Sequence, residues 1–220
     1  MSAVSLPSPS SAPTLRNLTA ARARELLAGD ALAIDLRLVA DYLAGHIHGS
    51  IPLLFEPGPG LGGRARDLLP LDARLVLLDD GVSPLERAAD SFRGKGFEVV
   101  GALAGGVRVW ADPLVTTPVI QLADVRDVLA LINVSDPGTV LPPGYGVGAS
   151  IPVERLWDKA SELGRGWDLG ILAGYGVRAA AAVGILEKLG FTRLTFVRTR
   201  RPGERPPQAP SVVFRAGCPP

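Results

Sequence analysis

The sequence has few of the residues on which several kinds of site depend. Its 220 residues include one cysteine, Cys218, and two histidines. One cysteine excludes an intrachain disulfide and a cysteine-rich zinc site, and it leaves a single thiol as a candidate nucleophile. His46 and His48 lie two residues apart with no acid or cysteine beside them, which makes a poor metal site. We therefore expect no metal and no cofactor.

Neither sign of charge is in excess, since 23 Lys and Arg face 22 Asp and Glu. A general binder of nucleic acid or of membrane surfaces needs a positive excess, so we expect neither partner. Near the C-terminus the arginines do cluster, at Arg193, Arg198, Arg200, Arg201 and Arg205. We interpret this cluster as a solvated tail, and docking to an acidic partner or to RNA is the less favoured alternative.

Long apolar runs are also missing. The longest uncharged run, residues 137–153, contains four prolines and four glycines, whereas a membrane helix needs roughly 18 clean apolar residues. Residues 1–13 lack the basic start and apolar run of a signal peptide. The sequence thus predicts a cytoplasmic protein without membrane contact.

The 47% of hydrophobic residues is instead distributed over short segments typical of a folded interior. Short apolar runs at 31–36, 74–78 and 98–103 predict buried strands. Helices are predicted at 17–27 and from about 84 to 95. Strands that alternate with helices indicate an α/β layer with parallel strand pairing.

The same alternation then repeats along the chain. The predicted elements are a helix at 122–129, a strand at 131–134, a Gly-rich loop at 144–151, a helix at 153–163, a strand at 169–173, a helix at 177–189 and a strand at 194–197. Asp35 corresponds to Asn133, and Gly96–Phe97 corresponds to Gly190–Phe191. We therefore predict a flexible leader (1–15), a first domain (16–112), a divergent second domain (113–199) and a Pro/Arg-rich tail (200–220).

One glycine-rich segment needs a separate interpretation. Gly58 to Gly63 formally fits the GxGxxG pattern of dinucleotide-binding loops. Its proline, and its position away from a strand–turn–helix start, argue against a dinucleotide site. We interpret Glu56–Gly63 as a flexible loop.

Several motifs, in order and at matching spacing, resemble the rhodanese family. Residues 33–37 (AIDLR) resemble the family's IDVR strand end, and residues 45–50 (GHIHGS) resemble GHIPGA. Gly96–Phe97, followed by residues 103–110 (LAGGVRVW), resembles the family's GF…LxGGxxxW. In the second copy the match is looser, with Asn133 and Ser135 in the Asp/Arg motif and no GGxxxW. The resemblance implies two tandem rhodanese-like α/β domains, each a mainly parallel sheet flanked by helices.

In rhodaneses a cysteine at the carboxyl end of a central strand begins a six-residue loop and takes sulfur from thiosulfate or another donor as a persulfide. The N–H groups of that loop stabilise the thiolate and hold the anionic donor. Counting back 17 residues from each Gly-Phe pair places this nucleophile position at Asp79 and at Ala173. Neither residue is a cysteine, so the resemblance predicts no catalytic nucleophile in either domain.

The two loops differ in what they retain. The second keeps the glycine and arginine of the family loop, so we predict that Gly174, Tyr175, Gly176, Val177 and Arg178 form a residual anion cradle for thiosulfate, sulfate or phosphate. In the first loop, Asp79 and Asp80 would repel such anions. A related phosphatase loop needs a cysteine with five residues between it and the arginine, whereas four separate Ala173 from Arg178.

The leading hypothesis is a catalytically silent tandem rhodanese-like protein that binds a small anion or a protein partner. The alternative is a sulfurtransferase that passes sulfur to a thiophilic acceptor. Its nucleophile would be either a natural cysteine replaced here by Ala173 or the tail thiol of Cys218. Against the tail thiol, Cys218 is followed by two prolines and lacks the helix N-terminus that lowers a thiol pKa.

Overall fold

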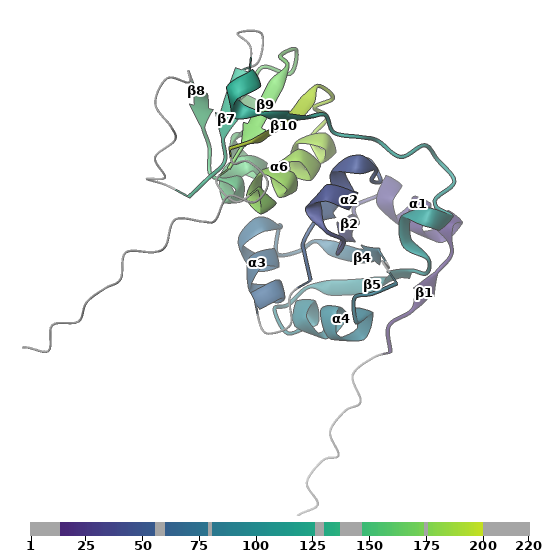
Figure 1. Cartoon of the computed structure of the whole chain (residues 1–220). Coiled ribbons are helices and arrows are strands. Elements are labelled where there is room, and N and C mark those ends of the chain that lie inside the picture. The colour runs from purple at the N-terminus through teal and green to yellow at the C-terminus, as the bar shows by residue number, and fades with distance from the viewer. Residues whose placement is uncertain are drawn as a thin grey trace, which may run out of the picture.

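The protein contains two five-stranded parallel sheets, one in each half of the chain (Figure 1). The computed structural model describes residues 14–55, 60–78, 81–125, 130–136, 147–173 and 176–199. We call the half from β1 to the turn after β5 the first unit, and the half from β6 to β10 the second unit. Both sheets are flanked by helices, which confirms the predicted α/β fold class.

The first unit has the strand order β1-β5-β4-β2-β3. Its strands are β1 (Asn17–Leu18), β2 (Leu32–Asp35), β3 (Ile51–Pro52), β4 (Arg74–Leu78) and β5 (Glu98–Leu103). Its helices are α1 (Ala20–Ala28), α2 (Val39–Ala44), α3 (Gly60–Leu68), α4 (Leu85–Arg93) and the 3-10 turn η1 (Gly106–Val109). Alternation along the strands separates two cores: Leu75 and Leu77 face α3 and α4, while Val76 and Leu78 face α1.

The second unit repeats this topology in the order β6-β10-β9-β7-β8. Its strands are β6 (Val119–Gln121), β7 (Ala130–Asn133), β8 (Val147–Ser150), β9 (Leu169–Leu172) and β10 (Leu194–Arg198). Its helical segments are η2 (Leu122–Asp124), η3 (Val153–Arg155), α5 (Leu156–Lys159), η4 (Ala160–Glu162) and α6 (Val177–Lys188). The registers also agree, because Asp35 pairs with Leu78 as Asn133 pairs with Leu172. The predicted internal duplication is therefore visible in the strand pairing.

The N-terminal prediction of a helix over 17–27 was wrong at its start. Asn17 and Leu18 pair with β5, and α1 begins only at Ala20. The boundary is set by Thr19, whose side chain accepts a hydrogen bond from the Arg22 N–H and so caps the helix.

The prediction of a loop over 56–63 was wrong where the structure describes it, because α3 begins at Gly60. A side chain at Gly62 would place its Cβ 2.2 Å from the Ser91 carbonyl oxygen of α4. The Gly62 N–H also donates to the Ser91 hydroxyl at 3.0 Å. Glycine here permits the close packing of α3 against α4. From the sequence alone, such a glycine cannot be distinguished from a glycine that belongs to a loop.

Two predictions in the second unit also need correction. Within the predicted loop at 144–151, residues 147–150 form the strand β8, which pairs in parallel with β7 at the sheet edge. The predicted helix at 153–163 is broken into η3, α5 and η4. Of the helix predicted at 122–129, residues 122–124 form a 3-10 turn and residues 126–129 lie outside the described part of the chain.

The two units share a core, and α6 lies at its centre. In Figure 1, α6 lies between the sheet of the second unit and the first unit, whose helices α2 and α3 face the side of α6 that points away from that sheet. Its residues from Ala179 to Glu187 are all buried. Gly184 lies so close to the first unit that an added Cβ would be 2.1 Å from the Ser50 carbonyl oxygen. Small side chains therefore allow α6 to pack against both units.

Candidate functional site

The strand register places the two candidate nucleophile positions at equivalent points of the fold. Asp79 directly follows Leu78, the last residue of β4, and Ala173 directly follows Leu172, the last residue of β9. These strands occupy the central position of their sheets. Residues 79 and 80 lie outside the described residues, as do Gly174 and Tyr175. Ala173 is described, and its methyl group is almost fully buried in the core.

Helix α6 begins three residues after Gly174, with Gly176 at its N-cap. Gly176 has a φ of 76°, a backbone conformation that favours glycine, and no side chain caps the helix. The N–H groups of the first turn of a helix have no partner within the helix and favour an anion nearby. Gly176 thus marks the start of α6 directly after the predicted cradle residues 174 and 175.

Arg178, the cation of the predicted cradle, already has partners in the second unit. Its Nη2 donates to the Glu154 carboxylate at 2.6 Å, and its Nη1 lies 3.2 Å from the Asp136 carboxylate. Its Nε donates to the Val134 carbonyl at 3.2 Å. These contacts connect the start of α6 to the end of β7 and to η3. An anion at this loop would compete with two carboxylates for Arg178, and the cradle remains a prediction.

At the carboxyl edge of the first sheet, where Asp35 occupies the position equivalent to Asn133, Asp35 and Arg37 form a close ion pair. Asp35 is fully buried at the end of β2, and Arg37 Nη2 donates to it at 2.7 Å. Arg37 Nη2 also donates to the Gly45 carbonyl at 2.8 Å. The pair connects the strand end to the 45–50 loop. The Asp35 carboxylate also accepts from the Arg37 N–H at 3.0 Å, and in the second unit the Asn133 side chain accepts in the same way from the Ser135 N–H at 3.1 Å.

Two shallow grooves flank Arg37 at this carboxyl edge of the first sheet. One, of about 400 Å³, is lined by Arg37, Asp41, Ala44, Gly45, Gly105, Val107, Arg108 and Leu114. The other, of about 380 Å³, includes Leu38, Phe55 and Val82. Leu38 is 60% exposed and Val82 is 87% exposed, so this second groove presents apolar surface to solvent.

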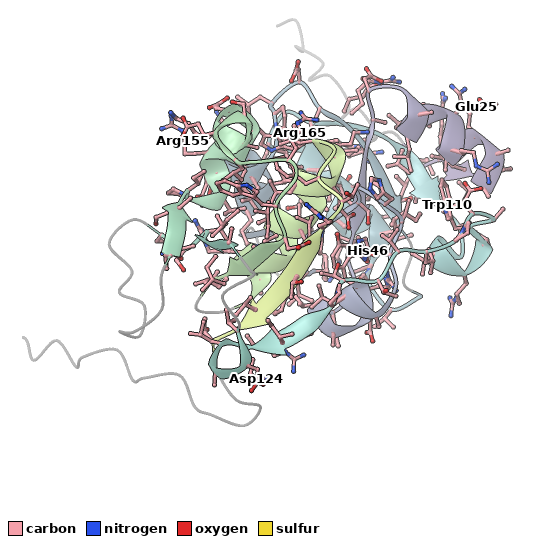
Figure 2. All side chains as sticks on the ribbon, turned by 90° about the horizontal axis from the view of Figure 1, so that it is seen from above. Glu25, His46, Trp110, Asp124, Arg155 and Arg165 are labelled. Atoms are coloured by element: carbon pink, nitrogen blue, oxygen red, sulfur yellow. The ribbon has the colours of Figure 1, made fainter. Side chains whose placement is uncertain are left out.

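His46 has a role that sequence reasoning missed. It is fully buried, and Figure 2 shows it in the interior of the molecule, away from the peripheral Trp110 and Asp124. Its Nε2 lies 3.1 Å from both carboxylate oxygens of Glu187, which comes from α6 of the second unit. One Glu187 oxygen also accepts from the Gly49 N–H at 2.8 Å. No signal in the sequence pairs residues 141 positions apart, so only the fold reveals this contact.

Neighbouring groups reinforce this contact between the units. The Tyr42 ring stacks on His46 at 3.9 Å, and its hydroxyl donates to the Ser50 carbonyl at 2.7 Å. Burial, followed by the nearby carboxylates of Glu187 and Asp35, raises the pKa of Tyr42 well above its usual 10. Lys188 donates to the Leu27 and Ala31 carbonyls at 3.3 Å, and burial lowers its pKa. Most of the polar surface of α6 near its C-terminal end is therefore used in holding the units together.

Among the residues with described positions, no group of three or more His, Cys, Asp or Glu is arranged to hold a metal ion. None of the described helices is long and apolar enough to cross a membrane. His48, the second histidine, is exposed.

Comparison with known proteins assigns the first unit. Residues 19–113 match the family model of the rhodanese-like domain. Residues 19–113 form a rhodanese-like domain. The second unit has the same strand order and register as this rhodanese-like domain.

Similar solved structures include proteins from three organisms. The Alr3790 protein from Anabaena sp. is 25% identical over 45% of this chain and 81% of its own, with a TM-score of 0.39. SseA from Escherichia coli, described as a 3-mercaptopyruvate sulfotransferase, is 18% identical over 84% of this chain and 98% of its own, with a TM-score of 0.39. A thiosulfate sulfurtransferase from Pseudomonas aeruginosa is 19% identical over 86% and 44%, with a TM-score of 0.37. No curated protein matches the chain.

Proposed function

We propose that this tandem rhodanese-like protein binds a partner and does not transfer sulfur. The observation that carries the proposal is Ala173 at the carboxyl end of β9, directly before the α6 N-terminus. A methyl group cannot form a persulfide, whatever the loop around it binds. The equivalent position after β4 holds Asp79, which is likewise no sulfur nucleophile.

The immediate surroundings support the same proposal. A thiosulfate or persulfide site gains from cations without partners, because both species are anionic. Arg178 shares its charge with Glu154 and Asp136, and Arg37 shares its charge with Asp35. At both carboxyl edges these arginines act as supports for backbone segments.

The partner that best fits the first unit is a protein segment with an apolar side chain next to Lys or Arg. Leu38, Phe55 and Val82 offer it apolar surface, and the Asp41 carboxylate lines the same groove. Arg37 adds no net charge there because Asp35 neutralises it. A small anion at residues 174–178 is the second partner that we propose, held mainly by N–H groups at the start of α6.

A thiosulfate:cyanide sulfurtransferase assay tests the absence of catalysis. We expect no turnover from the wild-type chain and none from Cys218→Ser. Turnover in either protein would overturn the proposal, and wild-type turnover that Cys218→Ser abolishes would in addition identify the tail thiol as the nucleophile.

A gain-of-function variant tests whether Ala173 alone accounts for the silence. In the Cys218→Ser background, Ala173→Cys restores a thiol at the end of β9, and Ala104→Cys is a matched control at an exposed position. We expect sulfur transfer from Ala173→Cys and none from Ala104→Cys. Equal activity of the two variants would show that the loop contributes nothing to the reaction.

Labelled probe peptides test the proposed groove. A peptide Arg-Val-Phe-Arg should bind more tightly than Glu-Val-Phe-Glu in fluorescence anisotropy, and Val82→Ser should weaken it. Leu71→Ser removes another exposed apolar side chain, one outside the groove, and should leave binding unchanged. Equal binding of the two peptides would argue against the acidic, apolar character that we assign to this surface.

A further inference from the structure

The hydrogen-bond partners of the His46 ring indicate where its protons lie. The His46 Nδ1 lies 2.9 Å from the Tyr42 carbonyl oxygen, and a carbonyl oxygen can only accept. The Nδ1 atom therefore carries a proton. The other ring nitrogen, Nε2, must then present either a lone pair or a second proton to Glu187.

The Nε2 atom lies 3.1 Å from each Glu187 oxygen, so a neutral ring would direct its lone pair at a carboxylate. A second proton between the ring and the carboxylate removes this repulsion and makes the contact attractive. The Gly49 N–H donates to Glu187 at 2.8 Å, which favours the ionised carboxylate and places that proton on His46. The docked units thus hold one proton more than neutral histidine and ionised glutamate would.

The other charged and titratable groups around the contact do not supply this proton. Tyr42 of α2 keeps its own proton and donates it to the Ser50 carbonyl. Lys188 of α6 donates to the carbonyls of Leu27, in the last turn of α1, and of Ala31, just after it. Asp35 at the end of β2 is neutralised by Arg37, and from the linker Val115 contributes only backbone hydrogen bonds to His46.

We propose that the docking of α6 onto the first unit is proton-linked through His46 and Glu187. The His46 side chain is fully buried and the Glu187 side chain is 9% exposed, so water replaces their mutual contact only when the units separate. A hydrated histidine loses its second proton above pH of roughly 6.5. Above that pH, separation releases a proton that docking must take up again, and the docked state loses stability as pH rises.

The consequence of opening would reach the candidate site of the first unit. Gly45 and Gly49 flank His46 in the same loop, and Gly45 accepts from Arg37 and lines the groove beside it. Release of Glu187 removes the partner of the His46 Nε2 and the partner of the Gly49 N–H together. The structure therefore provides a route by which pH loosens the loop that borders this groove.

Ring-nitrogen NMR of the full chain tests the protonation directly, since the two histidines are His46 and His48. We expect both nitrogens of His46 to be protonated at pH 7.5, and the signals of the exposed His48 are identified by their loss in His48→Asn. A neutral His46 ring at pH 7.5 would overturn the proposal. In Glu187→Gln the His46 ring should become neutral at this pH.

Hydrogen exchange at the Gly49 amide tests the linkage to opening. Its opening constant, corrected for the intrinsic exchange rate, should rise with pH in the wild-type chain by up to about tenfold per pH unit, the limit for one proton. The same constant should be independent of pH in Glu187→Gln and should match the wild type in His48→Asn. A pH-independent wild-type constant, or a dependence removed by His48→Asn, would disprove the linkage.

Discussion

The two units share one topology and differ in how they treat the carboxyl edge of the sheet. Both place a polar residue at the end of the strand next to the central one, Asp35 in the first unit and Asn133 in the second. Both side chains accept a hydrogen bond from the N–H two residues later, and Asp35 in addition forms an ion pair with the side chain of Arg37. The arginine of the second edge is Arg178, which comes from α6 and pairs with Glu154. The fold thus keeps the same backbone contact at this edge in both units and tolerates a change in the charged partner.

The larger difference concerns α6. In the first unit the equivalent helix, α4, is amphipathic and has solvent on one side. In the second unit α6 is buried over most of its length and supplies the interface with the first unit. A helix that contacts two cores needs small residues where the backbones approach, and α6 has alanine and glycine there.

The largest effect should come from Gly184→Ala, which tests the close approach of α6 to the first unit. Alanine normally stabilises a helix interior by about 1 kcal/mol relative to glycine. Here the new Cβ would lie 2.1 Å from the Ser50 carbonyl oxygen, a backbone atom that cannot turn aside. We expect the free energy of unfolding, measured with urea, to fall by about 3 kcal/mol.

The matched control is Gly63→Ala in α3. An added Cβ at Gly63 meets no atom within 4 Å, so helix propensity alone should act and the chain should be stabilised. If both variants shift stability in the same direction, the close packing of α6 against the first unit is not what distinguishes the two positions.

An exchange of the polar pairs tests the difference between the carboxyl edges. Asp35→Asn removes the charge that faces Arg37 in a buried place, and we expect a loss of about 2 kcal/mol in urea unfolding. Asn133→Asp should also destabilise the chain, because it buries a carboxylate beside Ser135. Adding Ser135→Arg to Asn133→Asp supplies a cation and should recover part of this loss. If the double variant recovers no stability, the carboxyl edge of the second sheet cannot accommodate the Asp–Arg ion pair found in the first unit.

The sequence predicted the repeated α/β layout and the equivalence of positions 79 and 173 because both depend on short-range periodicity and spacing. It failed where a residue's role depends on a distant neighbour. Gly62 and Gly184 look like residues that weaken a helix, yet each permits a close helix contact across the core. His46 was considered only as part of a poor metal site, and its partner Glu187 lies in the other unit. Such pairings arise from the packing of two units, which local patterns do not encode.

Tyr42→Phe tests the buried hydroxyl beside the interface through pH. The raised pKa means that folded Tyr42 keeps its proton where an unfolded tyrosine loses it, above pH of about 10. The wild-type chain should therefore lose stability as pH rises through this range, by up to about 1.4 kcal/mol per pH unit for this group. Lys188 titrates nearby but is present in both proteins, so the difference between their urea unfolding curves isolates Tyr42. An identical pH dependence in the two proteins would contradict the buried, protonated hydroxyl.

The smallest effect should come from Trp157→Phe, which tests a single hydrogen bond between the units. The Trp157 Nε1 of α5 donates to the Leu68 carbonyl at the end of α3 at 2.7 Å. Phenylalanine keeps the ring packing but leaves this carbonyl without its partner, so urea unfolding should show a loss of about 1 kcal/mol. Trp167→Phe changes an exposed ring within the second unit and should change stability by less than about 0.5 kcal/mol. Because this hydrogen bond is a single contact made by a short helix, losing it should weaken the docking of the units far less than a change in α6. Equal losses of stability from Trp157→Phe and Gly184→Ala would contradict the central place of α6 in the interface.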